Sequence, residues 1–438
     1  MRSDPLATTH ALAELGQWLW PAVADLPEPV QQRAQRLWLD TAACAWAGLR
    51  AEEPMRWLAQ QAASEAGPVS LPGCPLRLGA GAAATAFAMG ACWDEACEGL
   101  ALAHGRPGVP VVAALWSQIE ARRPSWRLLW QATAVGYEVA GRLGARLRIR
   151  PGMHVDGVWG AFGAAAALVY LRGGPWQEAL VALEACAVQL PYTLYAPVRQ
   201  GANVRNLYLG HSAWLGLQAD RAVAAGMAVP SGAIDEFATL ALDPDDAGDW
   251  LPAGRWLTTE SYWKPFAAVR HVHYGAQAAL RIRTQLPEPD QIDELKLSIY
   301  PEALQYCGNR APTTMLGAQF SLSFGVAAAL VFGDLSPQEF RPPRFSDPRL
   351  RRLEALIQVT PDATVFPAGR RVAHLSARVA DRWWQVAQDG VAGDAGCEPD
   401  RAAVQAKYAR FTQHDRAMAD WAHRVRHDDP QAPACLPT

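Results

Sequence analysis

The segment from Gly79 to Gly90 consists almost entirely of glycine and alanine. These residues put little or no side chain between neighbouring backbones, and alanine favours a helix more than other residues do. We therefore expect a helix here, close to other helices at the crowded centre of a domain. Apolar residues recur three or four positions apart elsewhere, which predicts further helices. These segments are Leu12–Leu19, Val30–Gly48, Met55–Ala66, Val111–Ala121, Ser125–Ala145, Gly157–Leu171, Trp176–Val188 and Ser212–Gly226.

The later part of the chain has a different character. Asp, Pro, Gly and Trp accumulate over Asp243–Thr259, and a helix is predicted over His271–Thr284. Two stretches, Glu294–Tyr300 and Val372–Val379, alternate apolar and polar residues as strands do. A turn is expected at Pro367–Gly369, just before the second of them.

These patterns predict a mainly α protein with two domains. Residues 1–258 are expected to form a large helical domain, and residues 259–399 a small α+β domain. Residues 400–438 begin with a helical stretch that has the polarity of a surface helix. We expect this stretch to pack back on the helical domain.

Composition excludes several functions. The chain has 40 basic and 43 acidic side chains, a net charge of -3 and no Lys/Arg-rich run, so nucleic acid is not an expected partner. Residues Met1–Trp20 lack the pattern of a secretory signal. The uncharged run Ala311–Gly333 is too polar for a membrane span and is interpreted as a buried helix. The eight cysteines form no C-x-x-C pair, which is typical of reduced thiols in a cytoplasmic protein.

Two motifs suggest cofactors. Gly79–Ala84 matches G-x-G-x-x-A, but a dinucleotide site needs a strand before it, and Gly73–Gly79 predicts a poor one. Close helix packing is the simpler interpretation. His271 and His273 resemble a metal-binding pair, yet a zinc site needs three or four ligands and no companion cluster lies nearby in the sequence. We expect no cofactor and no metal.

The remaining polar residues lie in glycine-rich or apolar surroundings. One histidine of this kind is usually a satisfied core or loop residue. Several clusters that combine histidines with fixed cations favour a functional site instead. The clusters are His104–Gly108, Gly152–Gly157, Asn203–His211 and Lys264–His273.

These clusters resemble the MmgE/PrpD family, which includes 2-methylcitrate dehydratase, cis-aconitate decarboxylase and iminodisuccinate epimerase. His154 begins a match to the family pattern H-x-x-G-x-x-G-x-x-G-A-A, and Lys264 begins a segment similar to its K-P-Y-x-x-C-R-x-x-H. Other similar segments are the opening helix at Arg33–Gly48, the central helix at Gly136–Gly144, and the P-T and K-F-S elements within Pro312–Ser321.

The resemblance implies a homodimer whose all-helical large domain and α+β lid domain enclose the active site. It implies a cofactor-independent lyase that removes a proton next to a carboxylate of a small (poly)carboxylate and eliminates water. Such chemistry needs cations for the developing negative charge and groups that move protons. The implied catalytic residues are His104, His154, Lys264 and Asp94, and the implied substrate-binding residues are Arg205, Arg270 and His273.

The sequence departs from the family pattern in the acidic segment before His104. Where the family has N-G-x-x-x-H-x-x-D-x-D-D, this chain offers Asp94 and Glu98, which would share one face if the segment were helical. The H-P-S element is His104-Gly-Arg, a usual lysine is Arg205, and the K-F-S lysine is Gln319. These changes predict a substrate other than 2-methylcitrate.

Several alternatives stay open. The same scaffold supports a decarboxylase, an epimerase or a lyase that tailors a specialised metabolite. The altered acidic segment also fits a catalytically silent dimeric scaffold or binding protein. A metal hydrolase that uses His271 and His273 is a third class.

Overall fold

The computed structural model describes residues 7–243, 248–286, 288–362, 371–394 and 396–437, and it is mainly α-helical. Its α-helices are α1 (Ala7–Ala22), α2 (Glu28–Leu49), α3 (Glu52–Ser64), α4 (Ala80–Trp93), α5 (Gly108–Trp116), α6 (Ile119–Arg122), α7 (Trp126–Arg146), α8 (Trp159–Leu171), α9 (Trp176–Ala187), α10 (Ala196–Gln200), α11 (Leu207–Ala224), α12 (Ala233–Ala241), α13 (Arg270–Arg283), α14 (Pro301–Cys307), α15 (Met315–Gln319), α16 (Leu322–Phe332), α17 (Pro348–Leu356), α18 (Arg401–Phe411) and α19 (Arg416–His427). Its strands are β1 (Ala66–Leu71), β2 (Cys74–Leu78), β3 (Glu294–Ile299), β4 (Ile357–Pro361), β5 (Val372–Val379) and β6 (Arg382–Asp389).

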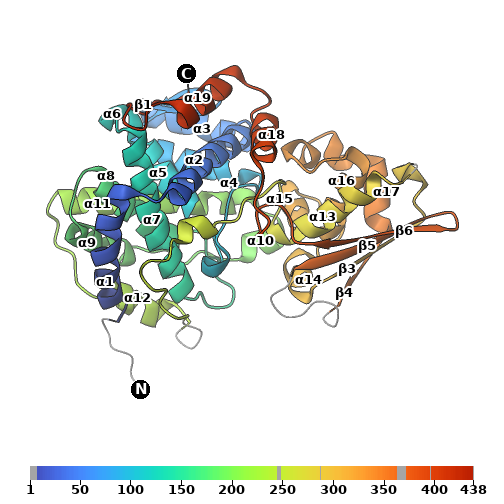
Figure 1. The fold of residues 1–438 in the computed structure, drawn as a ribbon, viewed down its shortest axis with the longest axis horizontal. Coiled ribbons are helices and arrows are strands. Elements are labelled where there is room, and N and C mark those ends of the chain that lie inside the picture. The colour runs from blue at the N-terminus through green and yellow to red at the C-terminus, as the bar shows by residue number, and fades with distance from the viewer. Residues whose placement is uncertain (1–6, 244–247, 287, 363–370, 395, 438) are drawn as a thin grey trace.

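The helices α1–α12 form the larger part of the molecule, which we call the helical part (Figure 1). Small residues let its central helices approach closely, as the glycine and alanine pattern predicts. A Cβ added at Gly136 of α7 would lie 2.6 Å from the carbonyl oxygen of Gly163 of α8. One added at Gly48 of α2 would lie 2.1 Å from the carbonyl oxygen of Gly90 of α4. Helix α4 is buried from Ala82 to Trp93, so the expected central helix is confirmed.

The helical part is not all-helical, which corrects the expectation. Strands β1 and β2 form an antiparallel hairpin, although β1 contains Gly67 and Pro68 and β2 contains Pro75. The prediction of a poor strand before Gly79 was therefore wrong. Strand β2 does lead directly into α4, but β1 is its partner in a two-stranded antiparallel sheet. That arrangement lacks the parallel neighbour of a dinucleotide-binding βαβ unit.

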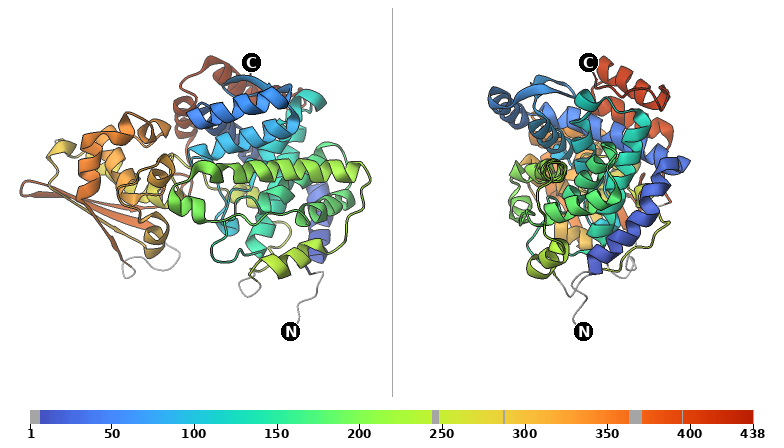
Figure 2. Two further views of the ribbon diagram at one scale, coloured as in Figure 1. Left: turned by 180° about the vertical axis from the view of Figure 1, so that it is seen from behind. Right: turned by 90° about the vertical axis from the view of Figure 1, so that its left-hand side faces the viewer.

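The other sheet has the strand order β4-β3-β5-β6. Strand β3 pairs with β5 in antiparallel fashion, with Leu297 opposite Leu375, and with β4 in parallel fashion. Both strands predicted from alternation are confirmed, while β4 and β6 were not anticipated. Figures 1 and 2 show α13, α16 and α17 over one face of this sheet. We call β3–β6 and α13–α17 the sheet part; the turn expected at Pro367–Gly369 lies outside the described residues.

The last two helices return to the helical part. Helices α18 and α19 both pack against α2, and Figure 1 shows α18 between the two parts. One hydrophobic cluster runs through both parts, from Ala34 through Leu297 to Trp421. The uncharged run predicted as one helix is split into α15 and α16. Within the described ranges, no helix has the length and apolar character needed to cross a membrane.

Candidate functional site

The segment after α4 is where the helical part meets the later chain. The helix ends at Trp93, and Glu95 adopts a left-handed φ of 53°. The segment is not helical beyond Trp93, so the condition under which Asp94 and Glu98 would share a helical face is not met. Four consecutive residues, from Trp93 to Ala96, each bond to the later chain. The backbone carbonyls of Trp93 and Ala96 accept hydrogen bonds from Gln319 and Lys407, respectively. The carboxylates between them pair with cations, Asp94 with Arg341 and Glu95 with Lys264.

Glu95 lies at the centre of a buried charge cluster, which we define as Glu95, Asp156, Arg106, Arg205 and Lys264. Glu95 pairs with all three cations: Arg106 Nη1 lies 3.0 Å from Oε1, Lys264 Nζ lies 3.2 Å from Oε2, and Arg205 also contacts Oε1. Asp156 contacts both guanidinium groups, with Arg205 Nη1 at 3.2 Å.

The charges of this cluster do not balance, because three cations face two carboxylates. Burial raises the pKa of Asp156, but Arg106, His154 and Lys264 together outweigh burial and hold that pKa below its usual value, so Asp156 is ionised. Burial lowers the pKa of Lys264 to about 8, which leaves the amine mostly charged at neutral pH but able to lose its proton. The cluster therefore carries an excess positive charge.

His154 lies beside the charge cluster, in the loop that carries Asp156. The backbone N–H of Asp156 donates to His154 Nδ1 at 3.0 Å, and a carboxylate oxygen of Asp156 lies 3.8 Å from the same nitrogen. A nitrogen that accepts a hydrogen bond carries no proton, so the neutral ring carries its proton on Nε2. Burial lowers the pKa of His154, which favours this neutral form. The side chain is 11% exposed, whereas that of Arg205 is 1% exposed.

A row of aromatic rings leads outward from His154. Its ring is stacked on Tyr195 with centroids 5.8 Å apart, and Tyr195 contacts Tyr306 of α14 at 6.3 Å. Tyr306 in turn is stacked on His271 of α13 at 5.5 Å. The row therefore crosses from the helical part to the sheet part, and Tyr306 is exposed at 41%.

Models of the MmgE/PrpD N-terminal domain and of the MmgE/PrpD C-terminal domain match residues 21–240 and 266–420. The chain belongs to the MmgE/PrpD family. A search of individually curated proteins found no match. MmgE/PrpD proteins include dehydratases and related lyases, so membership supports an enzyme in general terms. Neither match fixes the substrate or the reaction.

The structure brings three of the seven expected site residues near one another. His154, Arg205 and Lys264 come from distant segments and meet through Glu95 and Asp156. His104 lies at the end of the turn Ala101–Ala103 and is exposed. The next residue, Gly105, packs against Val155, so His104 is carried close to the His154 loop.

The other three lie outside the charge cluster. Asp94 is buried and accepts from Arg341 Nη2 at 2.9 Å. Arg270 Nε donates to Asp394 at 3.0 Å and its Nη1 to the Trp263 carbonyl at 3.0 Å, which ties α13 to neighbouring loops. His273 is fully buried and bonds through Nε2 to the Ala268 carbonyl at 2.9 Å. Their assigned roles stay predictions.

The two histidines of α13 do not face each other. His271 Nδ1 lies 2.8 Å from the hydroxyl of Tyr300, whereas His273 bonds to the Ala268 carbonyl and its ring packs against Phe266. In the described part of the chain, no three His, Cys, Asp or Glu side chains are grouped as metal ligands would be. The metal-hydrolase alternative thus gains no support from the geometry.

Sequence reasoning did not assign a role to three members of the charge cluster. The acidic pattern pointed to Asp94 and Glu98 rather than to Glu95. The position of Glu95 depends on the end of α4 at Trp93 and on its own left-handed backbone angle. Arg106 and Asp156 were visible signals, because each follows a histidine by two positions in a glycine-rich loop. Polar neighbours of a candidate histidine in such loops are therefore candidate site residues as well.

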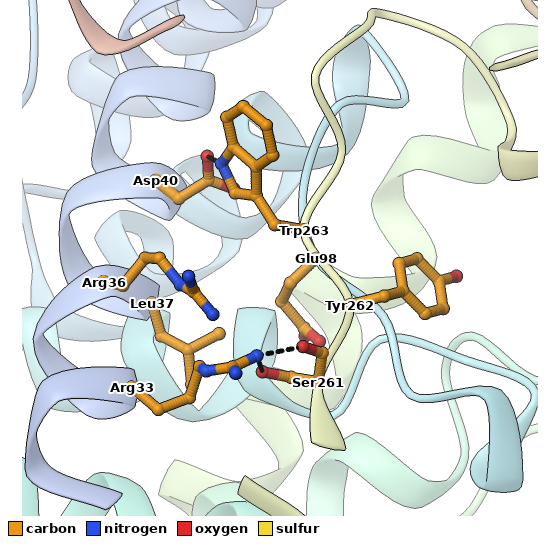
Figure 3. A pocket seen from close by; sticks show the side chains of 8 residues that line it. All are labelled: Arg33, Arg36, Leu37, Asp40, Glu98, Ser261, Tyr262 and Trp263. Atoms are coloured by element: carbon orange, nitrogen blue, oxygen red, sulfur yellow. Dashed lines mark hydrogen bonds between the residues drawn. The ribbon is translucent and has the colours of Figure 1, made fainter. Parts of the chain in front are cut away.

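Glu98 lines a small hollow between α2 and residues 261–263 (Figure 3). Its carboxylate accepts from the backbone N–H of Gly108 at 2.8 Å and from the Tyr137 hydroxyl at 3.1 Å. Arg33 donates to the carbonyl and hydroxyl of Ser261 across the same hollow. Burial raises the pKa of Glu98 to about 7. The hollow has a volume of about 10 Å³, enough for one water molecule at most.

A larger cavity of about 350 Å³ lies beside the turn that carries His104. Its size is in the range of small-molecule sites. The cavity lies between that turn, residues 259–261 and the chain that follows β6. Its lining residues are Leu100, Ala101, Leu102, Thr259, Glu260, Ser261, Gly393, Gly396 and Glu398.

Lys407 of α18 supports the segment between these features. Its ammonium group donates to the Ala96 carbonyl at 2.8 Å and to Asp40 of α2 at 2.5 Å. The same ammonium lies 5.1 Å from the ring centroid of Trp263. The residue after Glu95 is thus held by a helix from the far end of the sequence.

Proposed function

We propose that this protein is a lyase that removes a proton next to a carboxylate of a small acid and eliminates water. The observation that supports this best is the buried charge cluster with its excess cation beside His154. Elimination of this type builds negative charge on the carboxylate as the C–H bond breaks. Fixed guanidinium groups in a buried site stabilise that charge strongly.

Lys264 is the base in this proposal. Its pKa of about 8 leaves a usable fraction of neutral amine near neutral pH, which the two guanidinium groups cannot supply. Composition adds to the argument. Only three of the 40 basic residues are lysines, and two of these, Lys264 and Lys407, are buried. At position 264 this chain has a lysine, which can give up a proton that an arginine would keep.

The step balances as follows. Lys264 Nζ takes the proton from the carbon next to the carboxylate, and the C–H electron pair forms the double bond while the neighbouring C–O bond breaks. The hydroxyl leaves as water with the proton returned by Lys264, which regenerates the amine. Arg205 and Arg106 bind the carboxylate. His154, through its Nε2 proton, donates a hydrogen bond to the leaving oxygen.

The sheet part acts as a lid over this site in our proposal. The aromatic row from His154 to His271 spans the two parts, and Lys264 lies just before α13, the first helix of the sheet part. Movement of the sheet part would therefore bring Lys264 and the aromatic row toward or away from Arg205. The homodimer and the cytoplasmic location remain predictions.

Proton NMR in D₂O tests the reaction class. The purified protein is incubated with citrate, 2-methylcitrate, cis-aconitate, malate and 3-hydroxybutyrate. Growth of a vinyl signal together with loss of a C–H signal is expected for at least one hydroxy acid. The variant Lys264→Met should abolish the change, and Lys296→Met, which removes an exposed lysine of β3, should not. Absence of exchange and turnover with every acid would favour the silent scaffold over the lyase.

A further inference from the structure

Glu95 fills a position in the charge cluster that a substrate carboxylate would otherwise fill. It is the one member of the cluster that pairs with all three cations. Its place is set by the backbone, because Glu95 itself has a left-handed φ of 53° and the next carbonyl, of Ala96, is held by Lys407. The carboxylate of Glu95 is 4% exposed, so solvent does not weaken these pairings.

The cations that surround the charge cluster are already paired. Arg341 is paired with Asp94, Arg270 with Asp394, and Lys407 with Asp40. These pairs contribute no net charge to the cluster. What remains is the excess of one cation in the cluster itself.

From this balance we infer that Glu95 restricts the substrate to acids with a single carboxylate at the reacting end. The inference rests on the proposed lyase site and adds its substrate class. While Lys264 is protonated, one carboxylate neutralises the excess charge, whereas a second or third would lie uncompensated beside Glu95 and Asp156. Like charges brought together in a buried site oppose binding. Glu95 is thus a specificity-determining residue that acts as an internal carboxylate.

One titratable group of the charge cluster and one close to it act in the same direction. Lys264 loses its charge as pH rises through about 8. Glu98 follows Glu95 by three positions and interacts electrostatically with Arg106, and it gains a negative charge around pH 7. Both changes make the net charge of this region less positive, so acids with several carboxylates are disfavoured further at alkaline pH.

Titration calorimetry with unreactive acids tests this inference apart from turnover. Butyrate, glutarate and tricarballylate carry one, two and three carboxylates and lack a hydroxyl to eliminate. The wild-type protein should bind butyrate more tightly than tricarballylate by about tenfold or more. In Glu95→Gln the order should reverse, because three cations then face the single carboxylate of Asp156.

Glu354→Gln is the matched control. Glu354 is a buried glutamate in α17 that pairs with Arg351 outside the charge cluster, so its loss should leave the wild-type order unchanged. If Glu95→Gln does not fold, the inference is tested by the order of affinities in the wild type and in Glu95→Asp. Glu95→Asp keeps the charge, so it should keep the wild-type order. Tricarballylate binding as tightly as butyrate in the wild type would overturn the inference, as would failure of all three acids to bind.

The two proposals fail in different ways. If butyrate binds in the expected order but no hydroxy acid is dehydrated, the substrate class stands and the lyase is lost. If a tricarboxylate is dehydrated efficiently by the wild-type protein, the lyase stands and the restriction by Glu95 is lost.

Discussion

Two groups of buried charged residues in this chain differ in the balance of positive and negative charge. In α7, Glu138 pairs with Arg142, and the carboxylate also accepts from the backbone N–H of Leu257 and from the N–H and hydroxyl of Thr258. One cation meets one carboxylate, and both side chains are fully buried. The charge cluster around Glu95 is almost as deeply buried, yet it has three cations for two carboxylates.

The comparison teaches that burial alone does not distinguish an anchor from a binding site. The Glu138 pair fastens the turn at Leu257 and Thr258 to the middle of α7, and its charges cancel. The charge cluster keeps an uncancelled charge that a bound anion can neutralise. Removing a partner should therefore cost stability in one group and function in the other.

The largest effect is expected from Lys264→Met. Loss of a general base typically lowers the rate by about 10² to 10⁴, and we expect kcat/KM to fall in this range. Stability should change little, because two guanidinium groups and two carboxylates remain in balance. Steady-state kinetics and urea unfolding measure the two quantities. Lys296→Met serves as the control, and a Lys264 variant with most of its activity would remove Lys264 from the reaction.

The opposite pattern is expected from Arg142→Met. It leaves Glu138 as an uncompensated buried charge, which costs about 3–5 kcal/mol of unfolding free energy. Activity per folded molecule should stay near the wild-type value, because neither residue contacts the charge cluster. The double variant Glu138→Met with Arg142→Met should recover part of the loss. A stable but inactive single variant would contradict the assignment of this pair as an anchor.

The pKa of Lys264 tests directly whether the charge cluster contains a group that can lose its proton near neutral pH. With lysine labelled at ¹³Cε, NMR should show Lys264 titrating near pH 8, well below the usual lysine value of 10.5. Rate should rise with pH through this value as the neutral base forms. The unfolded chain binds the proton up to about 10.5, so stability should also rise with pH from about 8 to 10.5. A Lys264 signal that titrates near the usual lysine value of 10.5 would refute both expectations.

The smallest effect is expected in a region without charge. Gly136→Ala places a Cβ 2.6 Å from the Gly163 carbonyl oxygen, so α7 and α8 must separate. Overpacking of this kind costs about 1–3 kcal/mol. The control is Gly79→Ala, whose Cβ would come no closer than 3.5 Å to a neighbour. Urea unfolding of the two variants compares them, and equal stabilities would contradict the close packing.

Much of the helical part follows from local sequence. Glycine and alanine in α4 and α8 predict helices that approach closely, and alternation in β3 and β5 predicts strands. The missed strands have weaker signals. β4 follows α17 without a break, and only one residue of β6, Val386, is buried. The hairpin β1–β2 pairs despite its glycine and prolines because pairing outweighs their low strand propensity.

The charge cluster could be predicted only in part. Two of its cations, Arg205 and Lys264, and the neighbouring His154 occupy recognisable motif positions. Glu95 does not, because its role depends on where α4 ends and on a left-handed backbone angle that no periodicity reports. The charge balance depends on contacts among residues up to 169 positions apart, and such pairings arise only from the tertiary fold.

The bond from Lys407 to the Ala96 carbonyl has a consequence for synthesis on the ribosome. The loop that carries Glu95 is made early, but the helix that secures it emerges only after about three hundred further residues. The loop therefore stays without this anchor while most of the chain is synthesised. Trp421 of α19, which packs on Trp116 and Trp126 inside the helical part, arrives later still, so completion of this interior also waits for the end of synthesis.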